Sequence, residues 1–257
     1  ALWRRAGPYF APPRLALVMG ALAVLVLAPL ALRRVRRAPA VAVIGAAGLA
    51  AAWSGLATKL RQERRDIGET ERVVVTVLMS DIRSYSTIAE HADPSQLAGQ
   101  LNTHRAAMNQ AILGQAGTVM QFVGDAVMAV FGAPFPQPDH PDRAVAAALD
   151  MHALQAEINS RWQAGGLPPF GLGLGLSTGE AAAALLGSAE RLEYTLVGDT
   201  VNLSQRLQQL ADPGETVLSE ATFKALRTQV AAAALGAQRV KGRDAPVYAY
   251  KINKVGE

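Results

Sequence analysis

Two aspartates lie where strand ends can bring carboxylates together. Asp81 follows the continuous β-branched run of residues 73–79, and Asp125 follows Gly124 between two further apolar runs. The run at 73–79 predicts a central strand buried on both faces, and the Gly124-Asp125 pair predicts a tight hairpin. If these strands are neighbours in one sheet, both carboxylates point into a single site. Paired carboxylates bind divalent cations well, and two such cations can clamp a phosphoryl displacement.

The segment after Asp81 adds a way to bind phosphate. Residues 82–87 read IRSYST and predict a turn into a helix, where backbone N–H groups are free to hold an anion. A purely structural interpretation stays open at each position. Asp81 and Ser84 can be ordinary caps, and Gly124-Asp125 can be an ordinary turn.

Asn202 and Arg206 form a second pair with chemical potential. They are four residues apart in a predicted helix and therefore share one face. An amide and a guanidinium on that face can hold a ribose oxygen and the charge that develops on a phosphate. Solvated helix surfaces also carry such pairs, so this pair is informative only together with the aspartates.

The hydrophobic pattern supplies the elements that position these residues. Apolar runs predict strands over residues 73–79, 118–123, 126–131, 170–176, 194–197, 238–240 and 247–252. Spacing and composition predict helices over residues 94–115, 142–162, 199–210 and 220–227. Asp199-Thr200 is expected to cap the third helix. Strands and helices that interleave around antiparallel hairpins predict an α+β sandwich.

An apolar stripe in the second of these helices predicts core positions. Its members recur at spacings of three and four residues: Ala147, Met151, Leu154, Ile158 and Trp162.

Composition removes several classes of site. The 257 residues include no cysteine, which excludes disulfides, thiolate metal sites and a cysteine nucleophile. No two of the four histidines have the spacing of a metal-binding pair, so we expect no histidine-built zinc site. Gly171, Gly173 and Gly175 alternate with leucine and lack the third glycine of a dinucleotide-binding loop, so they predict a strand.

The N-terminal part differs in composition from the rest. Residues 1–72 carry an excess of Lys and Arg, whereas the remainder carries an excess of Asp and Glu. Residues 15–32 are uncharged and would span about 27 Å as a helix. Basic residues beside such runs indicate a membrane and argue against nucleic acid as a partner. We predict a membrane region at 1–57 with one or two transmembrane helices, a linker at 58–72 and a catalytic domain at 73–257.

The number and orientation of membrane crossings stay open. A second uncharged stretch, residues 40–57, is diluted by glycine, and basic clusters follow both stretches. If both stretches span, the clusters lie on opposite sides, so the positive-inside rule cannot favour both. Either a crossing is missing, or one stretch is re-entrant, or the rule does not hold here. Alternatively, the second stretch is a buried helix of a soluble part. Because the chain begins with Ala1 and not Met, we expect it to be a fragment whose sensor or further helices lie upstream.

Four ordered blocks indicate a family. SDIRSYS, FVGDAVMAVFG, GLSTGE and EYTLVGDTVNLSQRL, at residues 80–86, 122–132, 175–180 and 193–207, closely resemble the class III nucleotidyl cyclase catalytic domain in order and spacing. The resemblance covers about residues 73–252. It implies a ferredoxin-like α+β domain, here preceded by the α-helical transmembrane segments. It also implies a homodimer in which one protomer supplies the aspartates of a site and its partner supplies the asparagine and arginine.

The resemblance assigns a role to each matching residue. Asp81 and Asp125 match the aspartates that bind two Mg²⁺ or Mn²⁺ ions, with the Ile82 carbonyl as a further ligand. Asn202 matches the residue that orients the ribose, and Arg206 the residue that stabilises the transition state. The phosphate-binding residues are Ser84, Tyr85, Ser86 and, by a looser match for which Arg243 is an alternative, Lys241. The implied reaction is the attack of the ribose 3′-hydroxyl on the α-phosphate, which yields a 3′,5′-cyclic nucleotide and pyrophosphate.

The base-recognition positions depart from the common adenylyl cyclase pattern. Gln121 replaces the usual lysine, and Thr195 occupies the partner position as in one subclass. An amide can donate or accept, so Gln121 satisfies adenine but discriminates less against guanine. We favour ATP over GTP and keep two alternatives, a guanylyl cyclase and a weakly active or inactive nucleotide-binding module. The second is motivated by Gln121 and by Ser84-Tyr85, which replace the usual Gly-Phe. We expect a bacterial cell-membrane protein with a cytoplasmic catalytic domain and lipid contacts.

Overall fold

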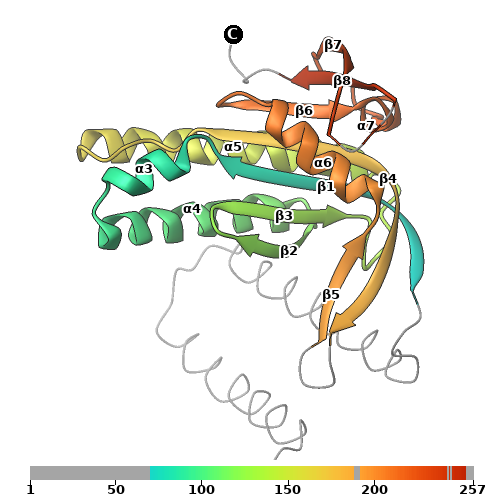
Figure 1. Cartoon of the computed structure of the whole chain (residues 1–257), viewed down its shortest axis with the longest axis horizontal. Helices are drawn as coiled ribbons and strands as arrows, with labels where there is room; N and C mark the ends of the chain where they lie inside the picture. The colour runs from blue at the N-terminus through green and yellow to red at the C-terminus, as the bar shows by residue number, and fades with distance from the viewer. Residues whose placement is uncertain (1–69, 188–191, 242, 244, 253–257) are drawn as a thin grey trace, which may run out of the picture. The chain divides into compact units, whose positions relative to one another are not determined.

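Eight strands form one mixed sheet in the computed structural model, which describes residues 70–252 except 188–191, 242 and 244. Seven strands follow the order β2-β3-β1-β4-β6-β8-β7, and β5 pairs with β4 (Figure 1). The strands are β1 Glu71–Ile82, β2 Thr118–Val123, β3 Ala126–Phe131, β4 Leu172–Gly187, β5 Leu192–Val197, β6 Glu215–Ser219, β7 Ala233–Gln238 and β8 Val247–Ile252. The helices are α3 Tyr85–His91, α4 Pro94–Gly114, α5 His140–Ala164, α6 Asp199–Leu210 and α7 Glu220–Ala225.

The central strand β1 lies between two antiparallel neighbours. Ser80 pairs with Val127 of β3, and Asp81 pairs with Gly173 of β4. The first residues of β4 pair in parallel with β6, and its last residues pair with β5. The β4–β5 hairpin therefore extends beyond the rest of the sheet (Figure 1). This arrangement brings the end of β1 next to the β2–β3 turn.

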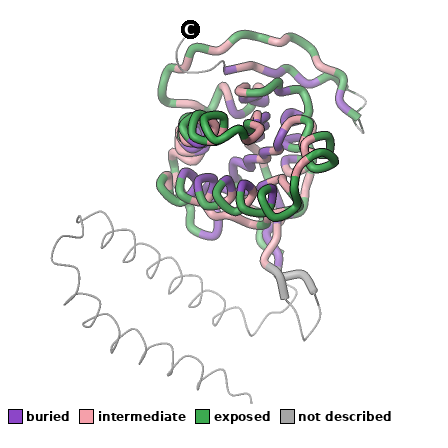
Figure 2. Tube along the Cα trace, turned by 90° about the vertical axis from the view of Figure 1, so that its left-hand side faces the viewer, coloured by how far each residue is buried: buried purple, intermediate pink, exposed green. Residues whose placement is uncertain are grey.

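Each face of the sheet has its own hydrophobic cluster, because successive strand residues point to opposite faces. Leu78 and Ile82 of β1 pack with α4 and α5, in a core that includes Met108 and Met151. Val75 and Val77 point to the opposite face. Helix α6 covers that face over β4 and β6, where residues such as Leu207 are buried. Figure 2 shows the buried residues on the inner sides of the helices.

The α+β architecture and the hairpin at residues 118–131 confirm the predictions from sequence. The apolar stripe of α5 is also confirmed, since Ala147, Met151 and Ile158 are buried and Leu154 and Trp162 pack against the core.

Several predicted boundaries are wrong. Asp81 lies inside β1 and not after its end. Strand β4 continues to Gly187, well past the predicted end at residue 176. The predicted strand at 238–240 lies earlier, as β7. The N-cap of α6 is Gly198, which has no side chain to cap the helix, and the Thr200 hydroxyl instead donates to the Glu180 carbonyl over 2.7 Å.

The predicted membrane region at 1–57 lies outside the described residues. Across residues 70–252, as far as they are described, no helix combines the length and the apolar character that crossing a membrane requires. Strand β1 begins at Glu71, two residues before the predicted start of the domain.

Candidate functional site

The two predicted metal-binding aspartates meet at the end of β1. Asp81 points to the α6 face of the sheet, because its neighbours Ser80 and Ile82 point to the other face. Asp125 follows Gly124 in the β2–β3 turn, where Gly124 has a φ of 61°. The Ile82 amide donates to Asp125 Oδ2 over 3.1 Å, so Asp81, Ile82 and Asp125 lie together. The sheet order therefore produces the carboxylate pair that the sequence predicted.

The electrostatics of this pair are unfavourable without a cation. Burial, then the hydrogen bond and charge repulsion with Asp125, raise the pKa of Asp81 from 3.8 to about 6. Arg83 and Gln208 act in the opposite direction and only partly offset this. A divalent cation would relieve the repulsion, so the donor set fits one. Among the described residues no third His, Cys, Asp or Glu completes a cluster. Backbone oxygen, water and phosphate are the further ligands that Mg²⁺ usually takes beside one or two carboxylates.

The raised pKa of Asp81 predicts a pH-dependent response to metal. Between about pH 4 and 6 the folded state retains a proton that the unfolded state has lost, so stability falls as the pH rises through this window. Above pH 6 the repulsion between the ionised Asp81 and Asp125 lowers the stability of the fold, and a bound cation can offset this loss. We expect Mn²⁺ to raise the Tm more at pH 7.5 than at pH 5, where it must displace the proton. Thermal denaturation at both pH values tests this, and equal shifts would contradict it.

The turn after β1 has unusual backbone geometry. Ser84 is the N-cap of α3 with a φ of 58°, a conformation more often adopted by glycine, and its side chain makes no capping hydrogen bond. Ser84 and Ser86 are exposed. The Tyr85 ring packs edge-on against Phe170 at 6.2 Å between centroids. The Tyr85 ring therefore anchors the turn in the core.

Arg105 supports the hairpin that carries Asp125, a role that no sequence motif indicated. Its guanidinium lies over the Phe122 ring at 5.3 Å from the centroid, and its Nη2 donates to the Gly124 carbonyl. Helix α4 thus holds the hairpin tip from one side.

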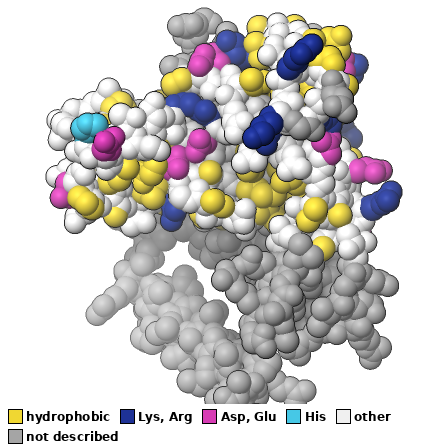
Figure 3. Space-filling model, viewed as in Figure 1, with side chains coloured by type: hydrophobic (Ala, Val, Ile, Leu, Met, Phe, Trp, Pro, Cys, Tyr) yellow, Lys and Arg dark blue, Asp and Glu magenta, His cyan; other side chains and the backbone are white. Residues whose placement is uncertain are grey.

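Asn202 and Arg206 lie on the outer side of α6. Asn202 is exposed, and Arg206 Nη1 donates to Gln209 Oε1 of the same helix over 3.2 Å. Gln208 points inward and contacts Asp81. Two residues correspond to about 200° around a helix, so Arg206 points away from the Asp81 of its own chain. Basic and acidic side chains are interspersed on the face that carries α6 (Figure 3).

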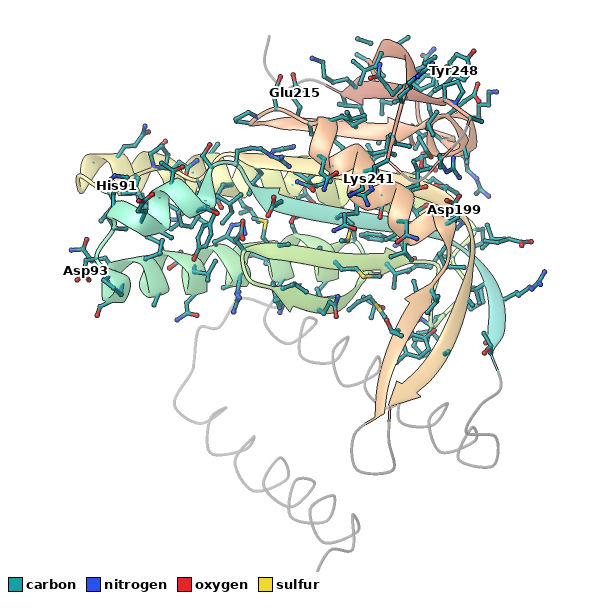
Figure 4. All side chains as sticks on the ribbon, in the orientation of Figure 1. His91, Asp93, Asp199, Glu215, Lys241 and Tyr248 are labelled. Atoms are coloured by element: carbon teal, nitrogen blue, oxygen red, sulfur yellow. The ribbon has the colours of Figure 1, made fainter. Side chains whose placement is uncertain are left out.

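The other predicted site residues are spread over the same domain. Gln121 is exposed on β2 beside a register shift, and Thr195 is half-buried on β5. Lys241 is exposed after β7, and Figure 4 labels it with Asp199, the first residue of α6. The alternative to Lys241, Arg243, is bound to the Asp199 carboxylate by its Nε and Nη2. This bridge ties the β7–β8 connection to the start of the helix that carries Asn202.

Comparisons with known proteins agree with this arrangement. The sequence profile of the Adenylate and Guanylate cyclase catalytic domain matches residues 69–254. Adenylate cyclase 1 of Rhizobium meliloti is 33% identical over 183 residues, 70% of this chain and 28% of that protein. The crystal structure of the adenylyl cyclase CyaB from P. aeruginosa superposes with a TM-score of 0.70 at 30% identity, covering 73% of this chain and 97% of that one. The guanylyl cyclase Cya2 gives 0.69 at 32% identity, over 73% and 95% of the two chains.

The curated relatives are much longer proteins. The chain spans less than a third of the adenylate cyclases from Rhizobium meliloti and Anabaena cylindrica, at 28% and 29% of their lengths. The similarity to solved structures, in contrast, covers almost the whole of CyaB and Cya2. The comparisons therefore concern the domain that carries Asp81 and Asp125.

Proposed function

The chain belongs to the adenylate and guanylate cyclase catalytic domain family, and from this premise we propose that it is an adenylyl cyclase. It would convert ATP to 3′,5′-cyclic AMP and pyrophosphate. The observation that carries the proposal is the carboxylate pair of Asp81 and Asp125 at the end of β1, with the Ile82 amide bound to Asp125. The relatives named adenylate cyclase favour ATP as the substrate.

The residues of this chain divide the chemistry between binding and charge stabilisation. Asp81, Asp125 and the Ile82 carbonyl would hold two Mg²⁺ or Mn²⁺ ions. Bound there, such ions polarise the α-phosphate and favour ionisation of the 3′-hydroxyl. The 3′-oxygen forms a bond to the α-phosphorus, the bond to pyrophosphate breaks, and the hydroxyl proton leaves. Asn202 would orient the ribose, and Arg206 would stabilise the charge on the α-phosphate. Ser84, Tyr85, Ser86 and Lys241 would hold the phosphates.

A homodimer would complete each site. Arg206 and Asn202 point away from the aspartates of their own chain, so they serve a site whose aspartates belong to a second copy. A two-fold arrangement makes the exchange reciprocal and gives two equivalent sites. This is the assembly that the family resemblance implies.

The assay that tests the function offers ATP and GTP separately to the purified chain with Mn²⁺ and detects the cyclic product. Cyclic AMP as the main product supports the proposal. Dominant cyclic GMP would replace it with the guanylyl cyclase alternative, which Gln121 and the likeness to Cya2 favour. No product from an intact dimer would leave a nucleotide-binding module.

Base recognition gives a specific prediction for Gln121. Replacing Gln121 with lysine is expected to raise the ratio of kcat/KM for ATP over GTP by about 10-fold, because a lysine donates to adenine N1 and cannot accept from guanine N1–H. Gln121 is exposed on β2, so the change does not disturb the core. Competition between the two nucleotides measures the ratio. An unchanged ratio would exclude this position from base reading.

We also propose that residues 1–57 tether the domain to the bacterial cell membrane, with the catalytic domain in the cytoplasm, where ATP is available. The uncharged stretches at 15–32 and 40–57, each followed by basic residues, support lipid contact. The tether predicts that detergent, but not high salt or carbonate, releases the chain from membranes. Release by salt alone would contradict it.

A further inference from the structure

Helix α6 lies unusually close to the sheet at one end of β4. Gly175 makes this possible, because a Cβ at that position would overlap the backbone of Ser204 and Gln208. Gly173 makes room for the Arg83 guanidinium in the same way. The alternating glycines of β4 thus create space for two groups that approach the end of β1.

Gln208 connects these groups. The residue is 5% exposed, and its Nε2 donates to Asp81 Oδ2 over 3.4 Å. Its main-chain oxygen accepts from Arg83 Nη2 over 2.9 Å. Arg83 is only two residues after Asp81. The side chain and the main chain of Gln208 are therefore both bound to the segment that carries the predicted metal-binding carboxylate.

We infer that Gln208 is a positioning residue for metal binding, which fixes the Asp81 carboxylate through its amide. The inference rests on the proposed function. Asp81 and Asp125 repel one another when ionised, and a carboxylate at a strand end is otherwise free to rotate away. The Gln208 amide binds Asp81 Oδ2 and so restricts the rotation of the carboxylate. Hydrogen bonds of this kind to a ligating carboxylate are typically worth 10- to 100-fold in metal affinity.

The test compares Gln208→Met with Gln205→Met in the full chain. Methionine keeps the length and the helix propensity of glutamine but removes the donor. Gln205 is exposed on the same helix and provides the matched control. The first readout is the Mn²⁺ concentration that gives half of the maximal increase in Tm, which requires no turnover. We expect Gln208→Met to raise it at least 10-fold and Gln205→Met to leave it unchanged.

The second readout separates positioning from general damage. At saturating Mn²⁺ the Gln208→Met variant is expected to regain a kcat within a few-fold of the unmodified chain, with the loss confined to the metal concentration required. A structural defect would instead lower kcat at all Mn²⁺ concentrations and lower the metal-free Tm. Equal Mn²⁺ dependence in both variants overturns the inference. If the unmodified chain shows neither Mn²⁺ stabilisation nor a cyclic product, the proposed function itself fails.

Discussion

Replacing Asp81 with asparagine is expected to lower kcat by roughly 1,000-fold, because a metal ligand is worth several kcal/mol of transition-state stabilisation. The same change is expected to make the metal-free domain more stable at neutral pH. Asparagine keeps the shape of the side chain and can accept from Gln208, but it does not carry the charge that burial and Asp125 disfavour. Loss of turnover with a gain in stability is a signature that misfolding cannot produce.

Turnover with Mn²⁺-ATP and thermal denaturation without metal measure the two effects. Asp150→Asn is the matched control, since Asp150 is exposed on α5, which packs against the opposite face of the sheet from Asp81. Full activity in Asp81→Asn would exclude this carboxylate from the metal site. A fall in Tm would show instead that the ionised side chain contributes to folding.

Replacing Arg206 with alanine is expected to lower kcat by about 100- to 1,000-fold, the usual cost of removing one donor that stabilises transition-state charge. The metal-free Tm is expected to change little, because the hydrogen bond of Arg206 to Gln209 lies on the exposed surface of α6 and not in the core. KM for ATP is expected to change less than kcat. Steady-state kinetics check this, with Gln205→Ala as the control, and a loss confined to KM would make Arg206 a binding residue only.

Mixing the two inactive variants tests where Arg206 acts. In a heterodimer of Asp81→Asn and Arg206→Ala, one site carries both changes and the other carries neither. Random exchange of protomers gives half heterodimers, so about a quarter of the original activity is expected to return. If both residues served the same chain's site, mixing would restore nothing.

Strands with large or β-branched side chains were predictable from the sequence, whereas strands rich in alanine were not. The β-branched run of β1 and the Gly124-Asp125 turn identified the central strand and the hairpin. The end of β4 and most of β7 are alanine-rich. The intrinsic conformational preference of alanine is for helix. Pairing with β1, β5 and β8 overrides that preference, and pairing between distant segments leaves no local signal.

The proximity of Asp81 and Asp125 was predictable, but the residues that support them were not. Residue type and spacing singled out Asp81, Asp125, Asn202 and Arg206, and the resemblance to the class III nucleotidyl cyclases assigned their roles. Arg105 and Gln208 contact the hairpin tip and Asp81 from distant helices. Nothing in the sequence relates Gln208 to Asp81 across 127 positions. Only the register of β1 and β4, and the glycines that let α6 approach, bring them together.

The two sides of helix α6 would couple the two active sites of a dimer. One side of the helix binds the Asp81 carboxylate of its own chain, and in the proposed dimer the other side would present Asn202 and Arg206 to the partner's aspartates. A helix is stiff along its length, so a displacement on one side moves the other. We therefore expect cooperative kinetics: a nucleotide analogue in one site alters the turnover of the second, and the rate departs from a hyperbolic dependence on substrate concentration.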